Sequence, residues 1–496
     1  MASRKRSTFD RLTGNQMNRQ KRRELGRRLA SSDPGLSIVH CNAGGIDVGN
    51  ESHFVAVPPD RDPNPVQEFG CWTAELMRMA KWLQACGIET VAMQATGVYW
   101  IAQYDILTEH GIRVVLVNAQ HTKNVPGRKS DVQECQWLMK LHTYGLLRDS
   151  FRLERQMERV RTIWRVRSRH VQEAGRAVQH MQKALTKMNI QLANALSDIS
   201  GVSGQAIIGA ILKGQRDPYQ LADLRDKRVR ASREQVALSL EGNWREDVLF
   251  ELQQAVDSYE FAHRQMGECD RKLEGYLASL PARVVEVAEP PKEAEAVSPQ
   301  KGQKTKKGKK ASTATKATKP KGNAPAFDLK AELQRICGVD LTSIDGISVM
   351  TAQTIVAEVG TDLRAFQSEE NFASWLGLTP SEDITGGKVI KKGRRKVQNR
   401  AAGALRMGAS TLKESQSYLG GRYRYLRRQL PTKASAVKAM AHYLALLVYR
   451  LLTKGQAWVD CGAAKFEEKR AVLEMSSLQA RARARGFKLI PLGGAQ

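Results

Sequence analysis

Apolar and polar residues alternate from residue 45 onward, and this pattern predicts β-strands near the start of the chain. Ile46 and Val48 flank Asp47 in a first strand, and a second strand covers residues 53–57 after a short polar break. A third strand is expected near residues 66–69. The following segments alternate between helical spacing and short apolar runs, which predicts helices over 73–86, 99–109 and 131–144 and strands over 88–93 and 113–117.

The resulting order, β-β-β-α-β-α-β-α, predicts the fold class of residues 37–150. Three strands with tight connections, followed by alternating helices and strands, are typical of a ribonuclease H-like α/β domain. A doubly wound nucleotide-binding domain would instead begin β-α-β around a glycine-rich turn. The glycines of GGID (44–47) come before the acid, and this segment leads directly into another strand.

Residues 151–285 are expected to be helical, with a heptad pattern over 157–195. Eleven of its twelve core positions are apolar, and Arg167 is the exception. The pattern predicts a long coiled coil. Dimerisation is the first interpretation, and pairing with a later helix over 246–280 of the same chain is the alternative. The block 200–245 is expected to form a small helical insertion.

The C-terminal domain, residues 327–465, is expected to be helical, with a tail over 466–496. Residues 341–352 resemble a helix-hairpin-helix turn at Gly346, in which backbone N–H groups would face a phosphate. A plain turn between helices is the alternative. A glycine-containing loop is expected over 381–396, and an amphipathic core helix over 435–452.

The charge balance indicates a polyanionic partner. The chain has 496 residues with 78 Lys and Arg against 51 Asp and Glu, a net charge of +27. The excess lies in 1–36, 299–322 and 388–428, with net charges of +7, +9 and +12. We interpret 1–36 as a basic arm and 286–326 as a Lys-rich flexible linker. In 388–428 one acid accompanies thirteen bases, which favours nucleic-acid binding over a solvated face.

Cysteine usage and hydropathy narrow the class of protein further. The seven cysteines are scattered and form no CxxC pair, which argues against a zinc ribbon or a disulfide scaffold. No apolar run approaches the ~20 residues of a membrane span, and the basic start of the chain lacks a secretory signal. We therefore expect a cytoplasmic protein without a membrane partner.

Acidic residues at three positions suggest a metal site. Asp47 lies among apolar strand residues, where an acid is costly unless it is paired or metal-bound. Asp131 and Glu134 are three residues apart and share one helix face. Convergent carboxylates are ligands for hard divalent cations, which assist phosphodiester chemistry. The alternative for Asp131 and Glu134 is an ordinary solvated helix start.

Three motifs together resemble a known family. AMQATGVYW (92–100), NVPGRKSDVQECQWLMKLHTYGLL (124–147) and GLTPSEDITGGKV (377–389) are similar to segments of the insertion-sequence transposases with a RuvC-like DEDD domain, the bridge-RNA-guided recombinases. The resemblance implies a RuvC-like domain with four acids and a C-terminal transposase domain with a nucleophilic serine. It also implies a DNA transposase or recombinase whose guide RNA, called bridge RNA, pairs with donor and target DNA.

Carried over residue by residue, the resemblance assigns the first and third acids to Asp47 and Asp131. The second acid, usually Glu, falls on Gln94, and the fourth, usually Asp, falls on Glu134. The serine position falls on Thr385. Glu134 retains the charge, Gln94 loses it, and Thr385 retains a hydroxyl but adds a β-branch that restricts χ1.

The resemblance also implies the cofactor and the partners. Asp47, Gln94, Asp131 and Glu134 would hold Mg²⁺ or Mn²⁺. We expect a homo-oligomer, a dimer or tetramer through the coiled coil, in which the acids of one subunit meet Thr385 of another, in a bacterial, nucleoid-associated setting. Two alternatives stay open, a RuvC-like junction nuclease that uses water and a catalytically decayed nucleic-acid-binding relic. Expected nucleic-acid contacts are the bases beside two of the motifs: Arg128, Lys129, Lys388, Lys391, Lys392, Arg394, Arg395 and Lys396.

Overall fold

The structure is a computed structural model. It describes residues 37–95, 97–118, 130–284, 323–385, 388–393, 399–455 and 462–489. The basic arm and nearly all of the Lys-rich linker lie outside the described residues. The chain divides into two compact units, residues 1–152 and 153–496, and each is described by itself.

The first unit contains a mixed five-stranded sheet in the order β3-β2-β1-β4-β5. Strand β2 is antiparallel to β1 and β3, while β1, β4 and β5 run parallel. This arrangement is compatible with the predicted ribonuclease H-like domain. The strands are β1 (Ala43–Val48), β2 (Ser52–Ala56), β3 (Val66–Gly70), β4 (Thr90–Gln94) and β5 (Arg113–Val117).

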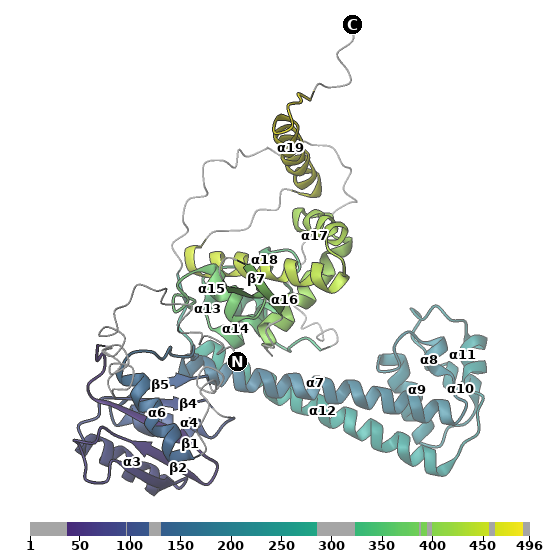
Figure 1. The fold of residues 1–496 in the computed structure, drawn as a ribbon. Coiled ribbons are helices and arrows are strands. Elements are labelled where there is room, and N and C mark those ends of the chain that lie inside the picture. Colours follow the sequence, from purple (N-terminus) through teal and green to yellow (C-terminus); the bar gives the residue numbers. More distant parts are fainter. Residues whose placement is uncertain are drawn as a thin grey trace, which may run out of the picture. The chain divides into compact units, whose positions relative to one another are not determined.

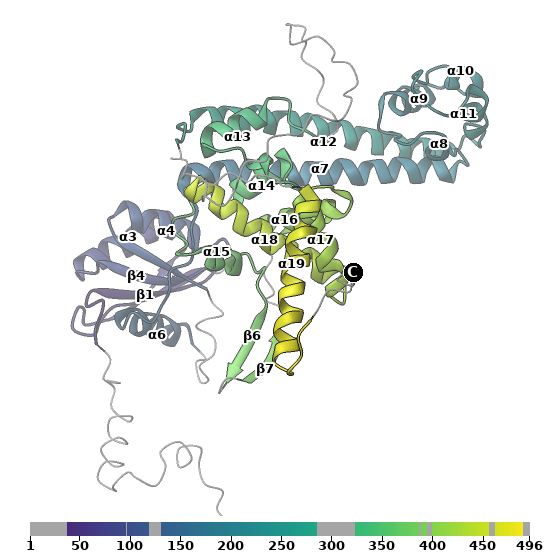
Figure 2. The same cartoon turned by 90° about the horizontal axis from the view of Figure 1, so that it is seen from above.

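Helices cover both faces of this sheet (Figure 2). Helices α3 (Thr73–Ala85) and α4 (Trp100–Glu109) lie on one face and bury an apolar core that includes Ile46 and Val48. Helix α6 (Asp131–Thr143) lies on the other face, where Cys135 and Met139 are buried. Because side chains alternate along β1, Gly45 and Asp47 point toward α6.

Gly45 determines how closely α6 approaches the sheet. A Cβ atom at this position would lie 2.2 Å from the Cys135 carbonyl oxygen and 2.3 Å from the Met139 nitrogen. The backbones of strand and helix are therefore in direct contact at Gly45, and only glycine leaves room for that contact.

The second unit begins with two long helices, α7 (Arg155–Lys187) and α12 (Glu246–Ser279), that pack side by side along their length (Figure 1). The apolar seam of α7 is thus covered by the same chain, which was the alternative to dimerisation. Short helices form a small cluster at the far end of this pair, as expected for 200–245. They are α8 (Leu192–Ala195), α9 (Val202–Leu212), α10 (Pro218–Ala222) and α11 (Arg233–Ser239).

The prediction of one continuous seam over 157–195 is wrong at its end. Helix α7 ends at Lys187, and Asn189 adopts a positive φ of 58°. This left-handed conformation cannot continue a right-handed helix. The last two seam positions, Leu192 and Ala195, consequently belong to the separate helix α8.

Arg167, the one charged residue of the seam, is buried together with Asp270 of α12. Its Nε donates to Asp270 Oδ1 at 2.5 Å and its Nη2 donates to Asp270 Oδ2 at 3.2 Å. Both side chains are almost fully excluded from solvent. The bidentate pair satisfies two buried charges and opposes any other register of the two helices.

The C-terminal region contains helices and one two-stranded sheet. Gly346 adopts φ 84° in the predicted turn, and the Ser348 side chain accepts from the Thr351 N–H at the start of the next helix. The elements are α13 (Leu329–Cys337), η2 (Leu341–Ser343), α14 (Val349–Val359), α15 (Glu369–Trp375), β6 (Ser381–Thr385), β7 (Lys388–Gly393), α16 (Arg400–Thr411), η3 (Leu412–Glu414), α17 (Tyr418–Gln429), α18 (Lys433–Lys454) and α19 (Gly462–Arg483).

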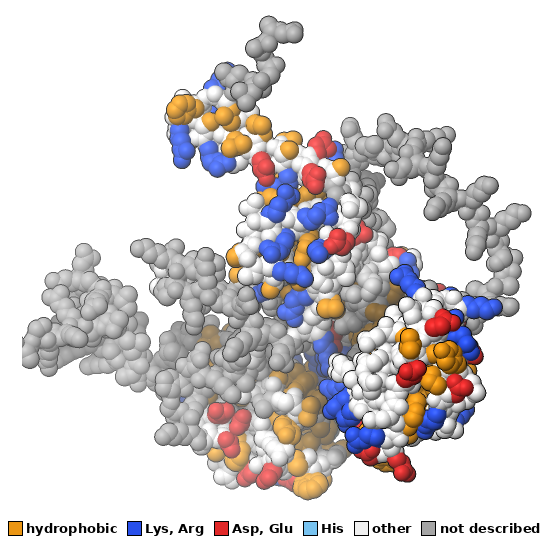
Figure 3. Space-filling view, turned by 90° about the vertical axis from the view of Figure 1, so that its right-hand side faces the viewer, with side chains coloured by type: hydrophobic (Ala, Val, Ile, Leu, Met, Phe, Trp, Pro, Cys, Tyr) orange, Lys and Arg blue, Asp and Glu red, His pale blue; other side chains and the backbone are white. Residues whose placement is uncertain are grey.

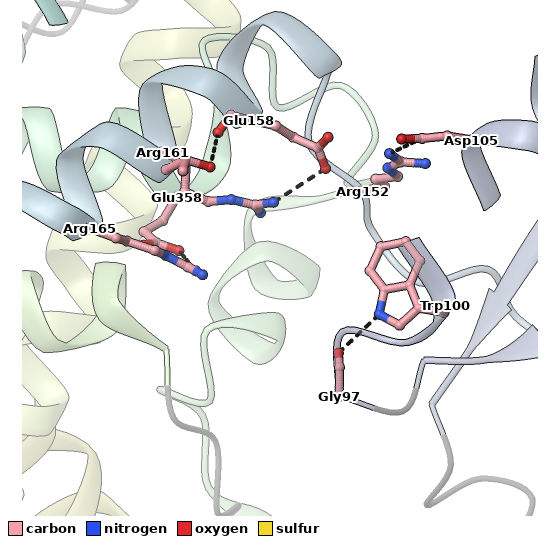
Figure 4. A network of polar contacts seen from close by, with 9 residues as sticks. Gly97, Trp100, Asp105, Arg152, Glu158, Arg161, Arg165 and Glu358 are labelled. Carbon is pink, nitrogen blue, oxygen red and sulfur yellow. Dashed lines mark hydrogen bonds and ion pairs between the residues drawn. The ribbon is translucent and has the colours of Figure 1, made fainter. Parts of the chain in front are cut away.

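Helix α14 is joined to α7 by polar contacts (Figure 4). The Arg165 guanidinium makes two hydrogen bonds to the buried Glu358 carboxylate, at 2.8 and 2.6 Å. The neighbouring Trp164 on α7 donates its indole N–H to Thr354 Oγ1 at 3.1 Å, and Thr354 lies one turn before Glu358 on α14. These contacts attach the C-terminal region to the base of the long helix pair.

Helix α18 corresponds to the amphipathic helix predicted over 435–452. Among the described residues it alone has the length and apolar composition of a membrane-crossing helix, and 56% of its most apolar window is buried inside the protein. His442 on this helix is half-buried, and desolvation lowers its pKa. This burial is typical of a core helix.

Replacing Gly45 with alanine should separate α6 from the sheet. We expect Gly45→Ala to lower the free energy of unfolding of the first unit by about 2–3 kcal/mol, because the new methyl group meets backbone atoms that cannot rotate away. Gly44→Ala is the matched control, since its nearest neighbour at 3.1 Å is the Val91 side chain. Thermal unfolding with hydrogen exchange in β1 and α6 measures the effect, and an equal loss in both variants would contradict it.

Removing one partner of the Arg167 pair should destabilise the long helices strongly. Arg167→Leu and Asp270→Leu should each cost about 3–5 kcal/mol, while the double variant should recover most of the loss because no buried charge remains unpaired. Arg245→Leu, from a solvent-exposed pair with Asp247, should cost less than about 1 kcal/mol. Hydrogen exchange in α7 and α12 is the measurement, and additive losses in the double variant would overturn this account.

Candidate active site

Asp47 and Gln94 lie side by side at the carboxyl end of two parallel strands. The register pairs Gly45 with Ala92 and Ile46 with Met93, so the next positions are Asp47 on β1 and Gln94 on β4. Neighbouring strands are about 4.8 Å apart, and both residues fall on the α6 side of the sheet. Gln94 is buried and Asp47 is half-buried. The backbone therefore brings together two residues that are 47 positions apart in the sequence.

Helix α6 brings Asp131 and Glu134 to the same edge. The helix begins after Ser130, whose side chain accepts from the Gln133 N–H. Contact with Gly45 holds the second turn of α6 against β1, and the first turn, with both acids, lies toward Asp47. Asp131 is exposed and Glu134 is half-buried. Each acid contributes to the electrostatic field at Asp47.

This environment raises the pKa of Asp47 from 3.8 to about 6. Burial is the largest cause, because desolvation disfavours the ionised carboxyl group, and the negative charges of Glu134 and Asp131 add to it. The Val48 backbone N–H opposes the shift. An acid held among like charges at a sheet edge is a candidate functional group.

The donor types fit a hard divalent cation. Three carboxylates and one amide carbonyl are oxygen ligands, and the repulsion among the acids is of the kind that a bound cation would relieve. Within the part of the chain that the structure describes, no three His, Cys, Asp or Glu side chains already stand close enough to hold a metal ion. The edge thus supplies suitable ligands, but their side chains are not closed around a common point.

Thr385 lies in the second unit, at the end of β6. The expected loop over 381–396 is corrected here, because 381–385 and 388–393 form an antiparallel hairpin. Thr385 pairs with Lys388, and the two glycines between them lie outside the described residues. The sequence contains a signal for the hairpin, because a Gly-Gly pair between two segments rich in β-branched residues is typical of a two-residue connection between strands. The Thr385 side chain is exposed.

The predicted nucleic-acid contacts are described only in part. The backbones of Lys388, Lys391 and Lys392 lie on β7. Five others lie outside the described residues: Arg128, Lys129, Arg394, Arg395 and Lys396.

Helix α17 carries a second basic surface, which no sequence motif indicated. Helix α17 has four arginines and no acid, and Arg427 and Arg428 are exposed. Figure 3 shows Lys and Arg gathered on this part of the C-terminal region. The net positive charge of residues 388–428 indicated this surface.

Asp47→Asn should stabilise the metal-free protein. At neutral pH the ionised Asp47 costs stability because its folded-state pKa lies above the ordinary value, and asparagine removes that cost. We expect the free energy of unfolding of the first unit to rise by about 1–2 kcal/mol at pH 7, allowing for solvent screening.

The difference in the free energy of unfolding between wild type and Asp47→Asn should reach its full size above pH 6. It should vanish below about pH 4, where Asp47 is protonated in both the folded and the unfolded wild type. Thermal unfolding in a chelator across this range measures it. Asp131→Asn is the control, with a smaller expected change because Asp131 is exposed. A less stable Asp47→Asn at pH 7 would refute the description of this environment.

Comparison with known proteins bears on both units. Residues 44–190 match a family model of DEDD transposases of the IS110 type, and residues 339–424 match the transposase IS116/IS110/IS902 family. A Sinorhizobium fredii (strain NBRC 101917 / NGR234) protein named as a transposase, y4pF/y4sB, is 33% identical over 135 residues, 25% of this chain and 33% of its own. A Pseudomonas aeruginosa (strain PAO1) protein named as a family 20 transposase is 29% identical over 123 residues, 23% of this chain and 35% of its own.

The matched segments span about a third of the length of each of these relatives. The two family matches include the acids of the first unit and the Thr385 hairpin of the second, in one chain and in the predicted order. The resemblance seen in the three motifs is confirmed: two segments of the chain match family models of IS110-type transposases, and curated transposases resemble part of it.

Proposed function

We propose that this protein is a DNA transposase that cuts and joins strands through the hydroxyl group of Thr385. The observation that carries the proposal is the convergence of Asp47, Asp131 and Glu134 on one sheet edge, with Gln94 beside them. The exposed hydroxyl of Thr385, on a hairpin whose second strand carries three lysines, supplies the nucleophile. The six-part organisation, arm, RuvC-like domain, helical region, linker, transposase domain and tail, is part of the same proposal.

The covalent step is a transesterification. Thr385 Oγ1 forms a bond to the phosphorus of one DNA phosphodiester, and the bond from that phosphorus to a deoxyribose oxygen breaks. The hydroxyl proton passes to water, and the released sugar oxygen takes up a proton. A sugar hydroxyl of a second strand then attacks the threonine ester, which joins the strands and restores Thr385.

The carboxylate edge would hold Mg²⁺ or Mn²⁺ through Asp47, Asp131, Glu134 and the Gln94 carbonyl oxygen. When bound, such an ion supplies positive charge that stabilises the phosphate oxygens during transfer. The chain's own contribution is orientation: Gly45 fixes α6 against β1, and this contact holds Asp131 and Glu134 opposite Asp47.

The proposed partners are donor DNA, target DNA and a guide RNA, in the bacterial cytoplasm and associated with the nucleoid. The net charge of +27 supports a nucleic-acid partner, and the RNA rests on the family resemblance alone. We further propose a dimer or tetramer in which Thr385 of one copy meets the acids of another. Because α12 covers the seam of α7, such an assembly would use the outer surface of the helix pair.

Gln94 and Thr385 depart from the pattern of the family, and these departures favour two competing functions. Gln94 lacks the charge of a glutamate, which weakens cation binding and favours a decayed nucleic-acid-binding relic. The β-branch of Thr385 restricts the rotation of its exposed hydroxyl, which favours a junction nuclease that uses water or, together with Gln94, the relic. The two alternatives differ from the transposase in their covalent products.

A single incubation separates the three functions. The full chain, RNA transcribed from the flanks of its own element, Mg²⁺ and end-labelled donor DNA are analysed on a denaturing gel. We expect a protein-linked DNA band that requires Asp47, the RNA and Thr385. Thr385→Ala and Asp47→Ala should each lower the band at least a hundredfold, whereas Thr385→Ser should retain or increase it because serine keeps the hydroxyl without the β-branch.

Other outcomes identify the alternatives. Free cleaved DNA that persists in Thr385→Ala would establish the hydrolytic nuclease. DNA binding without a band of either kind would establish the relic. Gln94→Glu then tests whether the missing charge is responsible, since restored cleavage at low Mg²⁺ would locate the defect at that position.

A further inference from the structure

Two exposed aromatic residues stand on the sheet edge that carries the acids. Trp72 follows β3 and is 74% exposed, and Tyr99 follows β4 and is 46% exposed. Strands β1, β3 and β4 point the same way, so their carboxyl ends share one edge. Two strands, β2 and β1, separate β3 from β4, which places the ends of β3 and β4 about 14 Å apart across the sheet, with the end of β1 and Asp47 between them.

Both aromatic residues occupy positions where a helix normally begins with a polar cap. Trp72 is the N-cap of α3 and Tyr99 is the N-cap of α4, and neither side chain accepts a backbone N–H. In the same unit α6 begins with a capping serine, Ser130. Ser, Thr, Asp or Asn at an N-cap contributes about 1 kcal/mol, so both helices forgo this stabilisation. The Trp72 side chain, 74% exposed, recovers little of this stabilisation by burial.

Each ring rests on a glycine two residues earlier. The Tyr99 ring lies 3.5 Å from the position of a Cβ atom at Gly97, and the Trp72 ring lies 3.4 Å from the corresponding position at Gly70. In both cases the sequence is Gly-x-aromatic. At both positions the ring is in ordinary van der Waals contact with the place that a Cβ atom would occupy, so each ring lies close to the turn that precedes it.

Polar contacts of Trp100 and Arg152 hold the turn that precedes helix α4 (Figure 4). The Trp100 indole N–H donates to the Gly97 carbonyl oxygen at 3.2 Å, and the Arg152 guanidinium stands over the Trp100 and Tyr104 rings while pairing with Asp105. Gln103 also donates to the Tyr99 carbonyl oxygen at 3.2 Å. A flat ring on a rigid turn loses little conformational entropy when it binds.

We propose that Tyr99 and Trp72 are stacking platforms for unpaired nucleobases on the two sides of the phosphodiester that Asp47 faces. This inference rests on the proposed function and names how the substrate strand is held. Nucleobases match two exposed rings that follow strands about 14 Å apart, because every base offers a π-face and a single strand can place two bases across a central phosphate. Val98 and Ile101 are also exposed beside Tyr99, but the carboxylate edge lies between this group and Trp72, which argues against one continuous apolar patch for a protein partner.

The test uses the full chain in a chelator, so that no strand is cut. The probes are a 20-nucleotide single-stranded DNA with 2-aminopurine at successive positions, its duplex, and an RNA of the same sequence. Tyr99→Ala and Trp72→Ala should each weaken single-strand binding about tenfold, since a base stacked on an aromatic ring contributes about 1–3 kcal/mol. Duplex binding should change less than about twofold, and the salt dependence should be unchanged because no phosphate contact is removed.

Two matched variants guard against trivial explanations. Tyr99→Phe keeps the ring and should bind as wild type. Phe250→Ala removes a side chain that is 67% exposed on α12, and it should have no effect. The 2-aminopurine fluorescence should be quenched by wild type at particular positions and should recover in the corresponding alanine variant. An effect on RNA alone would identify the guide as the source of the bases, and one on DNA alone the substrate strand.

The inference is overturned if duplex and single strand lose affinity equally, if Phe250→Ala shows the same loss, or if no aminopurine position is quenched. Its failure is distinct from failure of the proposed function. Quenching that depends on Tyr99, in a protein that forms no covalent band with DNA and Mg²⁺, would leave the platforms in place and refute the transposition chemistry.

Discussion

Backbone contact between α6 and β1 at Gly45 is the constraint on which the first unit depends. Strand β1 carries Asp47 two residues beyond the contact, and α6 carries Asp131 one turn before Cys135, which touches Gly45. The same contact therefore sets the separation of the acids. Any increase in the distance between strand and helix would lower the raised pKa of Asp47, because its neighbours would withdraw and water would enter.

The second unit depends in a comparable way on two ion pairs, one buried and one partly exposed. Arg167 with Asp270 fixes α7 against α12, and Arg165 with Glu358 fixes α7 against α14. Apolar seams tolerate sliding by a heptad, whereas a bidentate buried pair has one satisfied register. A single turn of α7, which carries Arg165 and Arg167, thus defines the positions of both the long helix pair and the C-terminal region that carries β6 and β7.

The sequence predicted most elements of the first unit because the spacing of apolar residues and the residue types indicate the same elements there. Ile46 and Val48 alternate with polar residues, and helices and strands differ in spacing. Other features depend on contacts that spacing does not record. A heptad seam shows that α7 needs an apolar partner but not whether α12 or a second copy provides it. The helix end at Asn189 results from one left-handed residue, and neither Gln94 nor Thr385 has a pattern of its own. These two residues were found through the resemblance, and Gly45 only through the packing of α6.

Gln94 is best understood through the charge already present at the edge. Burial and two neighbouring acids destabilise the ionised form of Asp47, as its pKa of about 6 indicates. A glutamate at 94 would add a fourth carboxylate on the neighbouring strand, about 4.8 Å from Asp47 in backbone spacing, at a buried position. In the metal-free protein that charge would be unpaired and costly. Glutamine keeps an oxygen directed to the same edge without this cost, so it exchanges cation affinity for stability of the free protein. The substitution is therefore a physically coherent variant of the site and does not by itself indicate loss of function.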